Sequence, residues 1–359
     1  MRGRCASTLS LLLACAIIAA AIGVSLALVR TERAEDYAIK CEAASRMELC
    51  MERIRQYKSE RGIPLSEEDI HATGLIGDRY TGITTTLGAI EAKRTVSNSD
   101  MAALMVRLLG DAGVAPGDTV AAGLSGSFPG MNLALLCACD ALEVTLVYIA
   151  SVGASTYGAN QLGLTFPDMA CNLAGEGYIR AYPAAITMGG DWDCGLSMDA
   201  EAAAAVRERM ARYGVPFYEI SDFTRNIRVR RALYEAEGEI ACYVGVGGNV
   251  ISSGRTGVEL PCGVVKPHTV TATGEESGLL ELYNSEGVPV INILNIKKLA
   301  ADNDLPYDPL TLPAMGESAP YYIEKYPLWP AVVGVAASAA VLLFAKRRAK
   351  APLNACRNK

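Results

Sequence analysis

Two long apolar segments near the ends of the chain constrain its fold more than any short motif does. The first runs from Ala6 to Val29 and the second from Leu328 to Ala345, and neither contains a charged residue. At 1.5 Å of rise per residue, a helix of either length can cross a hydrocarbon core of roughly 30 Å. We therefore expect two transmembrane helices, with one polar domain between them that works at a membrane surface.

The charges that flank these segments predict how the chain is oriented. Basic residues precede the first segment and follow the second, namely Arg2, Arg4, Lys346, Arg347, Arg348 and Lys350. Positively charged flanks tend to stay on the cytoplasmic side of a membrane. We therefore expect a two-pass protein of the inner or plasma membrane, with both termini cytoplasmic and the main domain extracytoplasmic.

A cleaved signal peptide is the alternative for the first segment. Its apolar core would be roughly 7–15 residues long and would end at a small-residue cleavage site. The segment from Ala6 to Val29 is longer than that and ends in Leu-Ala-Leu-Val. The sequence therefore favours an uncleaved signal-anchor, and whether cleavage occurs stays open at this point.

Composition limits the partners of the central domain. The chain has 33 basic and 39 acidic residues, and eight of the basic ones lie in the two tails. The remaining 25 basic residues give the domain a charge of about −14, which repels nucleic acid. A cluster of four arginines at 225–231 is best explained as a solvated surface that nearby glutamates compensate. The chain has only two histidines and no CxxC pair, which argues against a structural zinc site.

The distribution of residues along the chain predicts its domain organisation. The expected parts are a tail and transmembrane helix at 1–29, a juxtamembrane helical region at 30–81, an extracytoplasmic α/β domain at 82–304, a proline-rich linker at 305–327, a transmembrane helix at 328–345 and a basic cytoplasmic tail at 346–359. Within 82–304, short β-branched runs alternate with helical patterns. Strands are expected near 83–87, 119–123, 144–150, 183–188, 217–220, 241–246 and 288–293.

This alternation predicts an α/β fold with a mainly parallel sheet and helices on both faces, as in Rossmann-like proteins. In such sheets ligands bind beyond the carboxyl ends of the strands. Four glycine-rich turns fall at expected strand ends, at 125–130, 151–158, 189–195 and 247–249. Glycine lets backbone amides approach a ligand closely. The expected ligand-binding residues are Gly126, Gly130, Ser155, Thr156, Asn160, Gly189, Gly190 and Asn249.

Two sets of side chains in these turns are candidates for catalysis. Ser125 and Ser127 follow a strand and precede a helix, which is where nucleophilic serines often lie, although the full G-x-S-x-G pattern is absent. Their base is unresolved, because His268 is the only histidine in a suitable setting. Asp191 and Asp193 form a D-x-D pair that could act as acid and base or bind a divalent cation, the only cofactor suggested here. Each set can also be merely structural, as a tight turn or a helix cap.

Four segments in fixed order carry a resemblance to a known family. They are GLSGSFPGMN at 123–132, SVGASTYGAN at 151–160, FPDM at 166–169 and MGGDWD at 188–193. Together they resemble the poly-γ-glutamate system proteins, which are membrane proteins encoded beside bacterial poly-γ-glutamate synthesis and export genes. The resemblance covers about residues 30–300. It implies a bacterial cell-envelope setting in capsule biosynthesis, with the synthesis and export proteins as partners, and assigns no catalytic residue.

Three functions follow as alternatives. The first is a membrane-anchored accessory protein whose external domain binds, guides or processes poly-γ-glutamate, so that the polymer itself is a candidate partner. The second is a hydrolase or transferase that acts on amide or γ-glutamyl bonds through Ser125 and Ser127 or through Asp191 and Asp193. The third is a non-catalytic scaffold, in which small residues such as Gly334 and Ser338 let the two membrane helices pack closely.

Overall fold

A mainly parallel sheet of seven strands forms the centre of the computed structural model, which describes residues 2–355 and the side chains of residues 8–347. The strands lie in the order β7-β6-β4-β3-β8-β10-β9, and only β9 runs antiparallel to its neighbour. Their bounds are β3 Thr119–Leu124, β4 Thr145–Ser151, β6 Ala185–Thr187, β7 Phe217–Tyr218, β8 Ile240–Val246, β9 Gly263–Val265 and β10 Val290–Ile293. The predicted α/β fold with a mainly parallel sheet is confirmed.

The order of the strands reverses direction at β3. From β3 the chain adds β4, β6 and β7 on one side, and it then returns to add β8 and β10 on the other. The carboxyl ends of β3 and β8 therefore form the switch point of the sheet, where connections leave in opposite directions. Crevices at such points are the usual ligand sites of open α/β sheets. Leu124 pairs with Val246 here, and the amide of Ser125 donates to the Val246 carbonyl at 3.1 Å.

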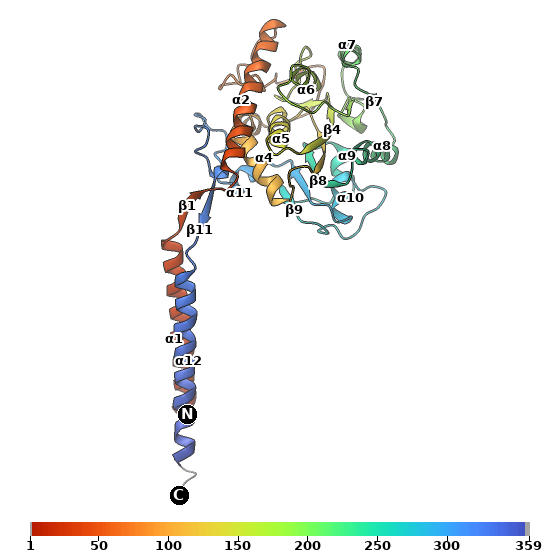
Figure 1. Ribbon diagram of the computed structural model, residues 1–359. Helices are drawn as coiled ribbons and strands as arrows, with labels where there is room; N and C mark the ends of the chain where they lie inside the picture. Colours follow the sequence, from red (N-terminus) through yellow and green to blue (C-terminus); the bar gives the residue numbers. More distant parts are fainter. Residues whose placement is uncertain (1, 356–359) are drawn as a thin grey trace. The chain divides into compact units, whose positions relative to one another are not determined.

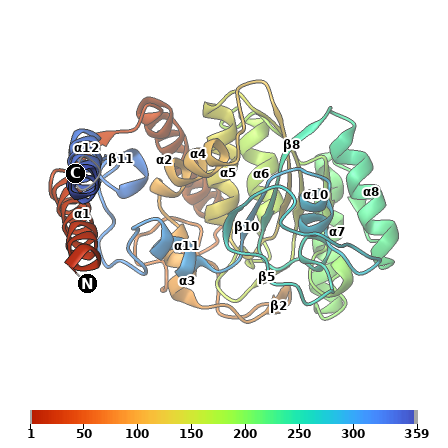
Figure 2. The ribbon, with the colours of Figure 1, turned by 90° about the horizontal axis from the view of Figure 1, so that it is seen from below.

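Helices cover both faces of the sheet because alternate residues of each strand point to opposite sides. Val120, Ala122 and Leu124 join a hydrophobic cluster with α2, α4, α5 and α6, whereas Ala121 joins a second cluster with α8 and α10. Figure 2 shows α4 and α5 on one side of β8 and β10, and α8 and α10 on the other. Their bounds are α2 Tyr37–Glu60, α4 Asp100–Asp111, α5 Pro129–Ala141, α6 Phe166–Gly175, α8 Phe223–Glu235 and α10 Leu279–Ser285.

Helix α2 is an integral part of this core. Its buried residues Ala43, Met47, Cys50 and Ile54 recur at helical spacing and pack in the same cluster as the central strands. It belongs to the compact unit formed by residues 35–321. Residues 35–81 of the region expected to be juxtamembrane and residues 305–321 of the expected linker thus belong to the α/β unit, in which Tyr321 is fully buried.

Shorter elements complete this unit. A separate two-stranded parallel sheet joins β2, Thr84–Thr86, to β5, Ala154–Ser155. The remaining helices are α3 Ile90–Val96, α7 Ala200–Met210, α9 Val250–Ser253 and α11 Ile296–Asp302, with 3-10 turns η1 Asp191–Asp193, η2 Ala211–Tyr213 and η3 Ala319–Tyr321. The nine cysteines that the structure describes are all free thiols.

The second unit contains residues 1–34 and 322–359. Its helices α1, Arg2–Ala27, and α12, Trp329–Ala355, lie side by side, and the strands β1, Arg30–Arg33, and β11, Tyr322–Lys325, pair antiparallel (Figure 1). The helices run in opposite directions and approach closely at small residues. The hydroxyl of Ser338 donates to the Ala14 carbonyl at 3.1 Å, and a Cβ on Gly334 would come within 2.5 Å of the Ala21 Cβ.

Both helices are long and apolar enough to cross a membrane. The qualifying stretches are Thr8–Ala27 and Trp329–Arg347, and very little of either is buried within the protein. Large apolar side chains are therefore left on the surface of the pair, with Leu9 70% exposed and Val332 66% exposed. A soluble protein rarely leaves so continuous an apolar surface uncovered.

Candidate functional site

The turn between β3 and α5 places two serines at the switch point of the sheet. The amide of Ser127 donates to the Ser125 hydroxyl oxygen at 3.2 Å, and the two hydroxyl oxygens lie 3.1 Å apart. Ser125 is buried, whereas Ser127 is half-buried. Helix α5 begins two residues after Ser127, so its unpaired amides and its dipole favour negative charge at this turn.

The turn that follows β4 packs directly against the serine turn. The backbone amide of Ser155 donates to the Ser127 hydroxyl oxygen at 3.0 Å. A Cβ on Gly126 would come within 2.8 Å of the Val152 carbonyl oxygen, so a side chain at this position would push the two turns apart. The turn after β3 and the turn after β4 thus meet in one cluster. It contains four predicted site residues: Ser125, Gly126, Ser127 and Ser155.

Lys93 of α3 contacts this cluster. Its ammonium donates to the Ser155 hydroxyl oxygen at 2.8 Å and to the Ser127 carbonyl oxygen, and it lies 3.7 Å from the centroid of the Phe128 ring. The lysine is only 2% exposed, and no ion pair in the described part of the chain includes it. Burial without a compensating charge lowers the pKa of Lys93 to about 7.

This group of residues has two chemical capacities. A lysine that titrates near neutral pH can accept a proton from the hydroxyl that it contacts, as a general base does. In its charged form the same ammonium can bind a carboxylate or another anion through a strong charge-assisted hydrogen bond. The sequence had pointed to the serines and left their base unresolved, and Lys93 supplies a basic group that it had not identified. His268 lies elsewhere and contacts the Ser285 carbonyl oxygen at 3.1 Å.

Asp193, the second carboxylate of the D-x-D pair, is held by the protein itself. It is fully buried and forms an ion pair with Arg230 at 2.5 Å. Its oxygens also accept hydrogen bonds from Thr187, Asn249 and Asn226, at 2.9, 3.0 and 3.2 Å. Asp191 is exposed to solvent. We assign Asp193 a positioning role, and a cation at Asp191 and Asp193 stays a prediction. Among residues 8–347, no three His, Cys, Asp or Glu side chains are grouped as metal ligands.

Arg230 corrects the expectation that the arginine cluster is a solvated surface. It lies in α8 with 3% of its side chain exposed, because Asp193 compensates its charge inside the protein. Its neighbour Arg231 does meet the expectation, since it pairs with Glu235 and Glu286 near the surface.

The loop that carries Asp193 has an unusual backbone. Gly189 and Gly190 have φ angles of 71° and 63°, and the non-glycine residues Trp192 and Asp193 also adopt positive φ, at 52° and 62°. Such conformations cost free energy in non-glycine residues and persist only where surrounding contacts impose them. The loop contacts the turn after β4 through a backbone hydrogen bond, in which the amide of Gly153 donates to the Met188 carbonyl at 2.8 Å.

The other predicted ligand-binding residues hold loops around the site. Asn249 caps α9 and donates to Asp193, which connects the end of β8 to the loop after β6. The hydroxyl of Thr156 makes two 2.8 Å hydrogen bonds with the backbone of Gly88. Asn160 is fully buried and donates to the Asp78 carbonyl at 2.7 Å and to the Thr84 hydroxyl at 3.0 Å. A Cβ on Gly130 would come within 2.1 Å of the Val96 carbonyl oxygen.

The predicted residues therefore form two clusters at the carboxyl edge of the sheet. In the first, Lys93 contacts Ser127 and Ser155, and Ser125 contacts Ser127. In the second, Asp193 pairs with Arg230 and accepts a hydrogen bond from Asn249. The turn at 151–158 contacts both, and Gly247 packs against Ser125 two residues before Asn249. No hydrogen bond between described side chains joins Ser125 or Ser127 directly to Asp193.

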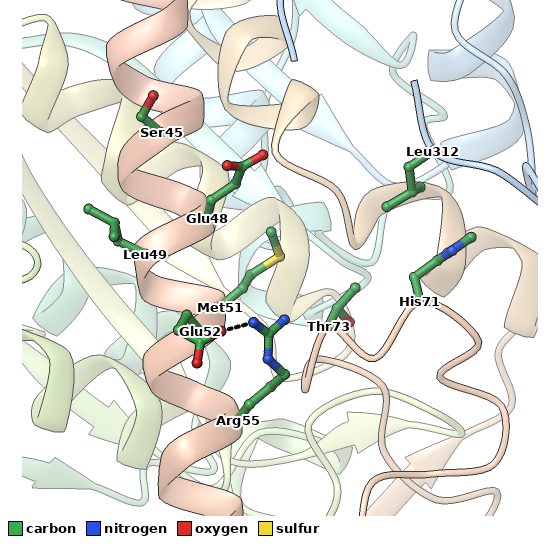
Figure 3. A pocket seen from close by; sticks show the side chains of 9 residues that line it. All are labelled: Ser45, Glu48, Leu49, Met51, Glu52, Arg55, His71, Thr73 and Leu312. Atoms are coloured by element: carbon green, nitrogen blue, oxygen red, sulfur yellow. Dashed lines mark hydrogen bonds and ion pairs between the residues drawn. The ribbon is translucent and has the colours of Figure 1, made fainter. Parts of the chain in front are cut away.

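A separate hollow of about 560 Å³ lies on the surface of α2 (Figure 3). It is lined by Ser45, Glu48, Leu49, Met51, Glu52, Arg55, His71, Thr73 and Leu312. Its polar groups already have partners: Glu52 pairs with Arg55, Glu48 accepts from Ser99 at 2.9 Å, and His71 contacts the Pro309 carbonyl oxygen at 2.9 Å. These polar groups are thus already used within the protein, and we do not place the functional site in this hollow.

No protein-family model, no curated protein and no solved structure matches this chain. The site is accordingly interpreted from its own geometry, in which Lys93 is the most distinctive group.

Proposed function

We propose that this chain is a membrane-anchored accessory protein of bacterial poly-γ-glutamate synthesis and export. Its α1 and α12 helices span the membrane with both termini in the cytoplasm. Its extracytoplasmic domain, with a Rossmann-like arrangement of strands, binds the polymer at the switch point between β3 and β8. The proteins that make and export the polymer are its partners. The proposal combines the four motif segments, the apolar helix pair and the chemistry of the Lys93 cluster.

The membrane placement is supported by the apolar surface of the helix pair. Side chains such as Leu12, Val335 and Phe344 are each more than half exposed, and lipid is the surrounding in which that exposure is stable. The basic residues Lys346 and Arg347 follow the apolar part of α12, which favours a cytoplasmic carboxyl terminus.

The observation that carries the binding function is the buried ammonium of Lys93. An enclosed cation at the start of α5 provides local attraction for one carboxylate within a domain whose net charge is strongly negative. Each γ-glutamyl unit offers such a carboxylate next to an amide bond. The glycine-rich turns supply backbone that can approach the amide closely.

Binding of fluorescein-labelled poly-γ-glutamate to the full chain in neutral detergent tests this function. A hydrogen bond to a charged group contributes about 1.5–3 kcal/mol, so Lys93→Met should weaken binding by about 10-fold or more. Lys266→Met is the matched control, because Lys266 is an exposed lysine away from the cluster. Equal affinity of the wild type and Lys93→Met would contradict the proposal, and absence of polymer binding to the wild type would favour a scaffold.

A further inference from the structure

We infer that Ser155 and Lys93 form a catalytic pair for acyl transfer at amide bonds, in which the Ser155 hydroxyl is the nucleophile and the Lys93 amine accepts its proton. The inference rests on the proposed function and deepens it, since it assigns a reaction to the same site. The substrate class is an amide whose acyl part carries a nearby carboxylate, as a γ-glutamyl bond does.

The geometry selects Ser155 among the three serines. A general base must lie within hydrogen-bond reach of the proton that it removes, and the Ser155 oxygen lies 2.8 Å from the Lys93 nitrogen. The Ser127 oxygen instead accepts hydrogen bonds from the Ser155 amide and the Ser125 hydroxyl, at 3.0 and 3.1 Å. Neither of those donors is a base, so Ser127 is better placed to position Ser155 than to react.

The surroundings of Lys93 keep its amine available in the neutral form. Its side chain is enclosed, and the Phe128 ring and the Ser127 carbonyl fix its nitrogen in place. No carboxylate pairs with it in the described part of the chain, whereas an acidic partner would hold it protonated. In the reacting complex the substrate carboxylate therefore lies at the positive end of α5 and not on the Lys93 nitrogen, and the ammonium form that attracts the polymer loses its proton before Ser155 reacts. Lys58 is a useful contrast: it is equally buried, but its amine donates to the Ile76 carbonyl oxygen and makes no hydrogen bond to a hydroxyl among the described residues.

The reaction balances with these two groups and water. The Ser155 oxygen attacks the amide carbon, and the hydroxyl proton passes to Lys93. The tetrahedral intermediate then breaks its carbon–nitrogen bond, Lys93 returns the proton to the departing amine, and an ester on Ser155 remains. Water or a second amine attacks this ester with loss of one proton to Lys93, and the Ser155 oxygen leaves and regains that proton. The negative charge of the intermediate develops near the start of α5, which favours it electrostatically.

Access to Ser155 is controlled by the segment around Gly88. Ser155 is 4% exposed, and a Cβ on Gly88 would come within 2.8 Å of its hydroxyl oxygen. Thr156 holds Gly88 through two hydrogen bonds, while the adjacent Leu87 is 87% exposed. A substrate must therefore displace this segment to reach the Ser155 hydroxyl.

A biotinylated fluorophosphonate, which reacts with activated serines and releases fluoride, tests the pair on the full chain in detergent. We expect labelling of Ser155, identified by peptide mass spectrometry, with a rate that rises through pH 7. Lys93→Met should slow labelling by about 100-fold or more, and Ser155→Ala should abolish it. Lys58→Met, which removes a second buried lysine, and Lys266→Met should leave the rate unchanged.

Three results would overturn the inference: no labelling of Ser155, labelling of another serine, or a rate independent of Lys93. The pH profile of the wild type keeps the test valid if Lys93→Met does not fold. Polymer binding that depends on Lys93 without labelling of Ser155 would overturn catalysis and leave the proposed function intact. Labelling of Ser155 without polymer binding would support the pair and contradict the proposed substrate.

Discussion

Asp193 and Arg230 form an ion pair of 2.5 Å that is closed off from solvent, with side chains 0% and 3% exposed. The pair connects the positive-φ loop after β6 to helix α8, and through Asn249 it reaches the end of β8. One buried ion pair thereby holds the connection after β6 and the connection after β8 together at the carboxyl edge of the sheet.

Removal of one member of this pair should be strongly destabilising. Arg230→Met would leave the Asp193 carboxylate buried without a counter-charge, which costs about 3–5 kcal/mol in comparable cases. Guanidinium unfolding of the full chain in detergent, followed by circular dichroism, measures the change. Arg231→Met is the control one residue away, because its ion pairs are partly exposed and should contribute less than about 1 kcal/mol. Similar losses in both variants would contradict the assigned role of the buried pair.

Gly130 should not tolerate even one methyl group. A Cβ at this position would lie 2.1 Å from the Val96 carbonyl oxygen, so α5 would have to move away from the helix that carries Lys93. We expect Gly130→Ala to lower the free energy of unfolding by about 1–3 kcal/mol and to weaken polymer binding. Gly110→Ala is the matched helical substitution: Gly110 has open space around it, and the change should stabilise the chain by about 0.5–1 kcal/mol. A neutral Gly130→Ala would show that this contact is not tight.

The stability of the chain should rise with pH above neutrality because of Lys93. Burial lowers its pKa to about 7 in the folded state, whereas an unfolded lysine has a pKa of about 10.4. Between these values the unfolded chain binds more protons, so the free energy of unfolding increases by up to about 1.4 kcal/mol per pH unit. Below pH 7 both states are protonated and this contribution is constant.

Unfolding measured from pH 6 to 10 in the wild type and Lys93→Met checks this prediction. Burial also lowers the pKa of Lys58, to about 8, so its contribution has the same sign and begins at higher pH. The difference between wild type and Lys93→Met should therefore be clearest from pH 7 to 8, and Lys58→Met should retain the increase in that window. Identical slopes in wild type and Lys93→Met would count against a depressed pKa.

The close approach of α1 and α12 depends on small residues. Gly334→Leu would place a large side chain where a Cβ already comes within 2.5 Å of Ala21, and the helices should separate. Cross-linking of native Cys15 to Ser338→Cys with a short bis-maleimide reports their proximity, read from cross-linked peptides. The yield should fall in Gly334→Leu and persist in Val335→Leu, because Val335 is 63% exposed. An unchanged yield in Gly334→Leu would exclude this packing mode.

The sheet could be predicted from the sequence because its evidence is local. Runs such as 119–123 and 241–246 are largely apolar, contain β-branched residues and are bounded by glycine, and β3 and β8 lie where they were expected. The run at 83–87 was also expected to be a strand, but β2 joins a separate two-stranded sheet with β5. Pairing partners depend on contacts between distant segments, which periodicity alone does not reveal.

The site could be predicted only in part, for the same reason. Glycine-rich turns at strand ends identified Ser125, Ser127 and Ser155, whose positions follow from the topology of a parallel sheet. Lys93 carried no such signal, because a lysine between alanine and arginine in a short segment is usually solvated. It is buried by residues 34 and 62 positions further along the chain. Arg230 escaped prediction likewise, since its partner Asp193 lies 37 positions earlier.

The titration of Lys93 tests the account most directly, because both the binding and the catalytic proposals require an uncompensated lysine amine beside Ser155. Competitive acetylation of the full chain in detergent with trace acetic anhydride, quantified for each lysine by mass spectrometry across pH 5–11, gives this titration. We predict half-maximal reactivity of Lys93 near pH 7, well below the pKa of about 10.4 of a lysine in an unstructured peptide. A midpoint for Lys93 at about pH 10.4 would contradict the account.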